Sequence, residues 1–141
     1  MRNPQYRYLI GAVSVSSDYS AVSRALIAEL LLSDESGVEA KQKAKLHKFN
    51  REIRRYCKML NISNPEQLSA LVRNIEPDHK DIPPLVKHYM KLGGKFCSFS
   101  VDENFGGTLD GLIVVDLPNA PPKSLLTYLG DNYSHYCEEH T

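Results

Sequence analysis

Four polar side chains follow directly after a segment with the composition of a β-strand. They are Ser14, Ser16, Asp18 and Tyr19, and a helical segment begins next to them. In α/β proteins, ligands bind where a strand ends beside a helix N-terminus, because backbone N–H groups are unpaired there. We therefore expect these four residues to contact a substrate. The simpler alternative, which the residue types favour, is that Ser16, Asp18 or Ser20 caps the helix, and the two roles are compatible.

Asp110 is a candidate of the same kind, because it lies at the start of an apolar run and is followed by Gly111. It could serve as a turn residue, as a buried partner for another loop, or as a ligand-binding carboxylate. A structural role is the more common outcome for an acidic residue beside glycine.

The chain contains no complete catalytic motif. The P-loop, the dinucleotide-binding glycine pattern, the zinc-protease H-E-x-x-H and the nucleophile elbow G-x-S-x-G are all absent. The H-x-x-x-x-D motif of glycerolipid acyltransferases is absent too, as is a glycine loop that could hold an acyl-CoA pyrophosphate. Near the C-terminus lie five residues of types that can bind a metal ion: His135, Cys137, Glu138, Glu139 and His140. No second group of such residues accompanies them elsewhere in the sequence, so no metal site is expected.

The most basic part of the sequence is an amphipathic segment at residues 38–60. Its apolar residues recur in steps of three and four, which is typical of one helical stripe. A solvated face is the default interpretation, and docking on anionic lipid is the next. Nucleic-acid binding is not expected, because no set of stacking aromatic residues accompanies the charges. The cations that would form the lipid-binding surface are Lys48, Arg51, Arg54 and Arg55.

The elements that position these residues follow from hydrophobic periodicity and from the Gly and Pro residues between them. Strands are expected at 6–15, 95–101 and 109–117, with Gly11 at a bulge or a close backbone approach. Helices are expected at 20–32, 38–60, 64–74, 81–92 and 122–139. The predicted fold class is α/β, with a small mixed sheet of about three strands flanked by about five helices. Residues 1–141 are expected to form a single domain.

Composition excludes several classes of protein. The formal net charge is zero and 24% of the 141 residues are charged, which is ordinary for a globular chain. No apolar run approaches the roughly 20 residues that a membrane-spanning helix needs. The three cysteines form no C-x-x-C pair, which favours a reducing compartment such as the cytoplasm.

Several segments resemble, in order, a family of bacterial GNAT-like lipid acyltransferases that are often labelled hemolysins. Residues 6–19 (YRYLIGAVSVSSDY) resemble the family's YLFGPVSISNDY, and residues 82–95 (IPPLVKHYMKLGGK) resemble IPPLLKGYLKLGAK. Residues 99–105 (FSVDENF) resemble FNVDPDF, and residues 109–117 (LDGLIVVDL) are identical to the family pattern. Residues 126–130 (LTYLG) are similar to LxRYMG. Together these segments span most of the chain.

The resemblance implies the C-terminal half of a GNAT-like domain, related to ornithine-lipid acyltransferases. Such a domain transfers a fatty acyl group from acyl-CoA or an acyl-carrier protein to a lipid or amino-acid acceptor. Residues near Ser14 to Tyr19 would then line the acyl or acceptor pocket, and Asp102 and Asp110 would orient the acceptor or brace the loop. Ala12 departs from the pattern, since it replaces the usual proline.

The family's N-terminal half, which holds the thioester, has no counterpart here. The chain is therefore expected to be a fragment or a truncated product that is inactive alone and binds no cofactor alone. Because a strand expected to be central would lack a neighbour, a homodimer is expected. The alternative hypothesis is a non-catalytic module that docks on a membrane or a partner through the basic helix at 38–60. The cysteine pattern predicts a cytoplasmic protein, and the basic helix would allow peripheral association with the inner membrane.

Overall fold

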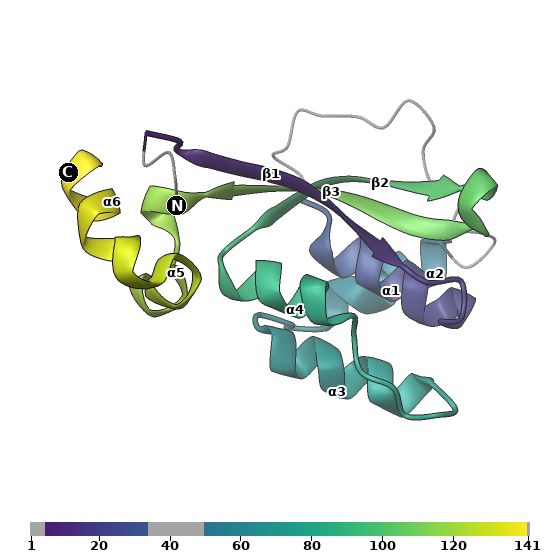
Figure 1. The fold of residues 1–141 in the computed structure, drawn as a ribbon. Coiled ribbons are helices and arrows are strands. Elements are labelled where there is room, and N and C mark those ends of the chain that lie inside the picture. Colours follow the sequence, from purple (N-terminus) through teal and green to yellow (C-terminus); the bar gives the residue numbers. More distant parts are fainter. Residues whose placement is uncertain (1–4, 34–49, 141) are drawn as a thin grey trace.

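A computed structural model describes residues 5–33 and 50–140 of the chain (Figure 1). Three strands and six α-helices make up this described part. In chain order they are β1 (Tyr8–Val15), α1 (Ala21–Leu31), α2 (Asn50–Met59), α3 (Pro65–Ile75), α4 (Pro84–Lys91), β2 (Lys95–Asp102), β3 (Thr108–Asp116), α5 (Pro122–Leu129) and α6 (Tyr133–Glu139). The predicted α/β class is confirmed. No described helix is both long enough and apolar enough to cross a bilayer.

The three strands form one sheet in the order β1-β3-β2, and both ladders are antiparallel, so the predicted size is confirmed while the pairing of the strands is antiparallel and not mixed. A single parallel bridge joins Leu32 to Phe96 at the β2 side. Along β3, buried and partly exposed residues alternate strictly, so one face of the sheet carries the core. Helices α1 and α4 lie against this face (Figure 1). The opposite face is called the outer face below.

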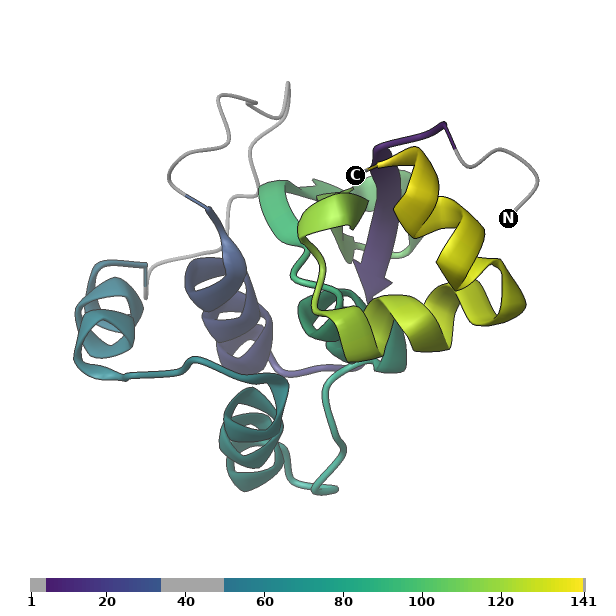
Figure 2. The same cartoon turned by 90° about the vertical axis from the view of Figure 1, so that its left-hand side faces the viewer.

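Helix α1 packs on two sides. Ile27 and Ala28 belong to the main core, together with buried residues of the sheet. Ala25 and Leu26 form a second cluster with Ile53 of α2. Viewed from the side, α2 lies at the periphery, with α1 between it and the sheet (Figure 2). Each fully buried aliphatic side chain in these clusters contributes roughly 1.5–3 kcal/mol to folding.

Local sequence signals explain where the helices begin. The Ser20 hydroxyl accepts a hydrogen bond from the N–H of Ser23 over 3.1 Å, so Ser20 is the residue that caps α1. The side chain of Asn64 caps α3 by accepting from Gln67 N over 2.9 Å, and Pro65 occupies the first helical position. The predicted starts of both helices are confirmed.

The structure corrects one helix of the sequence-based prediction and decides between the two alternatives for Gly11. The single helix expected at 122–139 is divided into α5 and α6, because Gly130 adopts a φ of +56° between them. Gly11 is not bulged, since the irregularity in the sheet lies between Phe96 and Ser98 of β2. Its close approach is confirmed: a Cβ on Gly11 would lie 3.0 Å from the hydroxyl of Tyr89.

The basic helix is described only in its second half. The part of the predicted 38–60 helix before Asn50, including Lys48, lies outside the described residues. From Asn50 onward the prediction is confirmed, as Ile53 is buried while Arg51 and Arg55 are exposed.

Candidate functional site

Three polar side chains form a row across the outer face of the sheet. Ser14 of β1 lies opposite Asp110 of β3, and Asp110 lies opposite Ser100 of β2. Directly opposed residues share a face and have Cβ atoms about 4.5–5.5 Å apart. The structure therefore brings together two of the predicted site residues, Ser14 and Asp110, and adds Ser100.

The carboxylate of Asp110 is the unusual member of this row. Its Oδ1 atom is buried and has no hydrogen-bond partner. A buried carboxylate oxygen without a donor costs roughly 1–3 kcal/mol or more. Such an atom is suited to a ligand that brings its own donor, for example an ammonium or hydroxyl group.

The row ends at an open edge of the sheet. The carbonyl of Arg7 accepts from Leu117 N over 2.9 Å, so the backbone of Arg7 faces β3. Pairing alternates along an antiparallel strand, and the N–H and C=O groups of Tyr8, Ile10, Ala12 and Ser14 therefore point away from β3. No described strand lies beyond β1.

Ala12 is consistent with this geometry. A proline at this position, as in the family pattern, would lose no hydrogen bond to β3, because the N–H of residue 12 faces the open edge. Ala12 has a backbone N–H, so the open edge of this chain carries one more hydrogen-bond donor than an edge with proline at this position.

Asp102 lies in the turn between β2 and β3 and has a structural role. Its carboxylate accepts from Asn104 N over 2.9 Å, and its carbonyl accepts from Gly107 N, also over 2.9 Å. Arg24 of α1 donates to the carbonyl of Gly107 over 3.1 Å. Asp102 is expected either to orient the acceptor or to brace the loop, and the contacts that the structure shows are those of a residue that braces the loop.

Ser16, Asp18 and Tyr19 lie in the turn before α1. The Ser16 hydroxyl donates to Asp18 Oδ2 over 2.9 Å, and the Tyr19 hydroxyl donates to the carbonyl of Asp81 over 2.5 Å. Lys80 binds the carbonyl of Asp18 over 2.8 Å and lies 4.7 Å from the centre of the Tyr19 ring. The turn thus contacts the loop between α3 and α4, whereas Ser14 lies on the outer face.

That loop carries two carboxylates that the sequence analysis did not single out. Burial alone would raise the pKa of Glu76, but hydrogen bonding from Ser20 and the cation Lys80 hold it below its usual value. Burial would likewise raise the pKa of Asp81, yet Lys87, Arg73 and the Ile82 N–H hold it well below its usual range. Both groups are charged at neutral pH and are bound within the fold. The charged sequence at residues 76–81 was the only signal for them.

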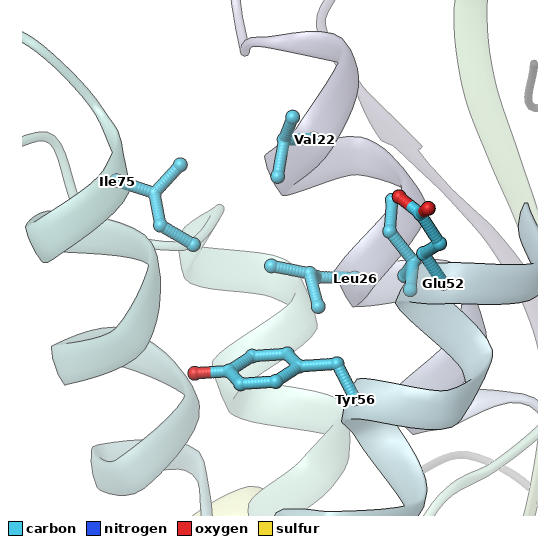
Figure 3. A pocket seen from close by; sticks show the side chains of 6 residues that line it. Val22, Leu26, Glu52, Tyr56 and Ile75 are labelled. Carbon is cyan, nitrogen blue, oxygen red and sulfur yellow. The ribbon is translucent and has the colours of Figure 1, made fainter. Parts of the chain in front are cut away.

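An apolar groove opens between α1, α2 and α3 (Figure 3). Its volume is about 370 Å³, and its lining residues are Val22, Leu26, Glu52, Ile53, Tyr56 and Ile75. Three helices contribute to it, which is why no local pattern in the sequence indicated it. The groove lies on the side of α1 that faces α2, so it is separate from the outer face of the sheet.

The described cations of the predicted anion-binding surface are all exposed. Arg54 differs from the others because it binds Glu29 of α1 through two hydrogen bonds of 3.2 Å. Arg51 and Arg55 are exposed, and Lys48 lies outside the described residues. Within the described ranges, no three His, Cys, Asp or Glu side chains gather as a metal site would require.

Known proteins offer no match to this chain: no family model, curated protein or solved structure matches it. A functional assignment therefore depends on the motifs of the chain and on its own geometry.

Proposed function

We propose that this chain takes part in fatty acyl transfer and supplies a carboxylate for the acceptor and a strand edge for the extended arm of the acyl donor. The observation that carries the proposal is the buried, unpartnered Oδ1 of Asp110, next to the open edge of β1. The motif resemblance to GNAT-like lipid acyltransferases supports the same class of reaction.

The open edge of β1 suits the acyl donor. Acyl-CoA and acyl-carrier protein both present their thioester on an extended arm that contains amide groups. An extended chain with amides can hydrogen-bond to an edge strand, as peptides do when they extend a sheet. The outward N–H and C=O groups of Ile10 and the outward C=O group of Ala12 would bind this arm, and the thioester would lie near Ser14.

Asp110 suits an amine acceptor. Its carboxylate would bind the ammonium group and accept a proton from it, because only the neutral amine is nucleophilic. The amine nitrogen then attacks the thioester carbon, the C–S bond breaks, and the thiol leaves with a proton. Ser14 and Ser100 lie on either side of Asp110 in register and would orient the acceptor through their hydroxyls.

We expect donor binding without turnover from this chain alone. In the described part, α1 and α4 cover only the core face of the sheet, and no helix covers the row (Figure 1). A site open to water does not favour the charge development of acyl transfer. The second wall of the site would come from another segment or another chain.

The test is equilibrium binding of palmitoyl-CoA, measured together with palmitoyl transfer to a long-chain primary amine. We expect saturable binding, no transfer above background, and a loss of about tenfold in affinity for Ile10→Pro, which removes one outward donor. Ile10→Val keeps the N–H and should bind like the wild type. Absence of saturable binding would overturn the proposed function. Palmitoyl transfer by the chain alone would contradict the claim that the site needs a second wall from another segment or chain.

A further inference from the structure

We propose that the outer surface of α2 docks this protein on an anionic lipid bilayer. The surface is formed by Arg51, Arg55, Lys58 and Met59, all of them exposed. Met59 is 78% exposed, the largest value among the exposed large apolar side chains of the described residues. The inference goes beyond acyl transfer and does not depend on it.

The helix geometry places these four residues together. At 3.6 residues per turn they fall within an arc of about 100°. Ile53 and Cys57, on the opposite side of α2, are buried against α1. The four residues therefore lie on the side of α2 that faces away from α1. Figure 2 shows α2 at the periphery of the fold.

The charges on this surface are available to a partner. No ion pair involves Arg51, Arg55 or Lys58 in the described part of the chain, while Arg54 is held by Glu29 at the side of the helix. Glu52, the acidic residue of α2, lines the apolar groove instead. The arc thus carries three positive charges, and Glu52, which is also exposed, lies beside Met59 at the edge that faces the groove.

The combination of cations with an exposed thioether favours lipid over nucleic acid. An amphipathic basic helix lies in the bilayer interface, with cations on the headgroups and apolar side chains below them. Single-stranded nucleic acid requires aromatic stacking surfaces, and Tyr56, the aromatic residue of α2, faces the groove (Figure 3). The groove opens beside the docking surface, so its apolar lining would lie near the bilayer.

Vesicle co-sedimentation of the whole chain tests the proposal. We expect binding to phosphatidylglycerol-rich vesicles, little binding to pure phosphatidylcholine vesicles, and weakening as salt rises above about 0.1 M. Each cation near an anionic surface contributes roughly fivefold in affinity, so the double variant Arg51→Gln/Arg55→Gln should bind about 25-fold more weakly. Met59→Ala should weaken binding by a further few-fold.

The matched control is Lys91→Gln/Lys123→Gln, which removes the same total charge from exposed positions on α4 and α5. It should bind vesicles like the wild type. Equal losses in both double variants would mean that net charge alone drives binding, and this would overturn the proposal. Absence of binding to anionic vesicles, or tighter binding of single-stranded RNA through the same residues, would overturn it as well.

Discussion

The carboxylate of Glu76 accepts a hydrogen bond from the backbone N–H of Ser20 over 2.9 Å. Glu76 is 2% exposed and follows α3, whereas Ser20 caps α1, so this contact joins the end of one helix to the start of another. Lys80, 3.6 Å away, balances the buried charge. The contact fixes the turn that carries Tyr19 and its neighbours.

Removing this contact should destabilise the fold. We expect Glu76→Ala to lower the free energy of unfolding by about 2–3 kcal/mol, because a buried charge-assisted hydrogen bond is lost and Lys80 is left with one acidic partner fewer. Urea denaturation measures the change. Glu66→Ala, at an exposed residue of α3, should stay within about 0.5 kcal/mol of the wild type. Equal effects would contradict the structural role of Glu76.

The same network should make stability depend on pH in the acidic range. The pKa values of Glu76 and Asp81 are both lowered in the folded state. The stability that they contribute is therefore fully present above their unfolded pKa values, about 4.3 and 3.9, and is lost as pH falls through the folded values. Urea midpoints measured from neutral pH downward should fall below about pH 5. The double variant Glu76→Gln/Asp81→Asn should show a flatter curve, and an unchanged slope would contradict this account.

Gly111 should be intolerant of a side chain. A Cβ at this position would lie 2.7 Å from the ring of Phe99, which stacks on Phe96 at a centroid distance of 5.6 Å. We expect Gly111→Ala to cost about 1–3 kcal/mol, measured by thermal or urea unfolding. At Gly11 the nearest atom is the movable hydroxyl of Tyr89, so Gly11→Ala should cost less than about 1 kcal/mol. A larger loss of stability in Gly11→Ala than in Gly111→Ala would contradict the packing described around these two glycines.

Asp110 and Asp102 should respond differently to loss of the carboxylate. Asp110→Asn removes a carboxylate that has a buried, unpartnered oxygen, and we expect the free energy of unfolding to stay the same or rise by up to about 1 kcal/mol. Asp102→Ala removes the acceptor of the Asn104 N–H and should lower the free energy of unfolding by about 1 kcal/mol. A marked loss of stability in Asp110→Asn would indicate that Asp110 is structural, against the proposed acceptor site.

The open edge of β1 should also promote self-association. Unpaired edge strands readily pair with a second copy, and Tyr8 and Ile10 of β1 are more than half exposed. We expect sedimentation equilibrium to show a dimer that weakens on dilution and in Ala12→Pro. A monomer at the highest accessible concentration would count against this pairing.

The three strands and most helices could be predicted, because each has a local signature. The alternation in β3, the cap at Ser20 and the proline at the start of α3 are all visible in the sequence. The division between α5 and α6 could not be predicted, because a glycine inside a helical pattern does not reveal whether it adopts a positive φ.

The candidate site was predicted only in part. The sequence indicates Ser14 and Asp110 as separate candidates, and only the strand register places them opposite each other. Ser100 gave no signal of its own, since it reads as one polar residue in an alternating strand. Glu76 could not be recognised as buried, because its burial depends on the packing of α1 against the α3–α4 loop.

Hydrogen exchange of the β1 amides tests most directly whether this edge binds an acyl donor. In dilute solution the inward N–H groups of Gly11 and Val13 should exchange slowly and the outward ones of Ala12 and Ser14 rapidly. Saturating palmitoyl-CoA should slow the outward pair by about tenfold or more, while CoA without an acyl chain should have a smaller effect. Outward amides that stay rapid at saturating donor would contradict the proposed site.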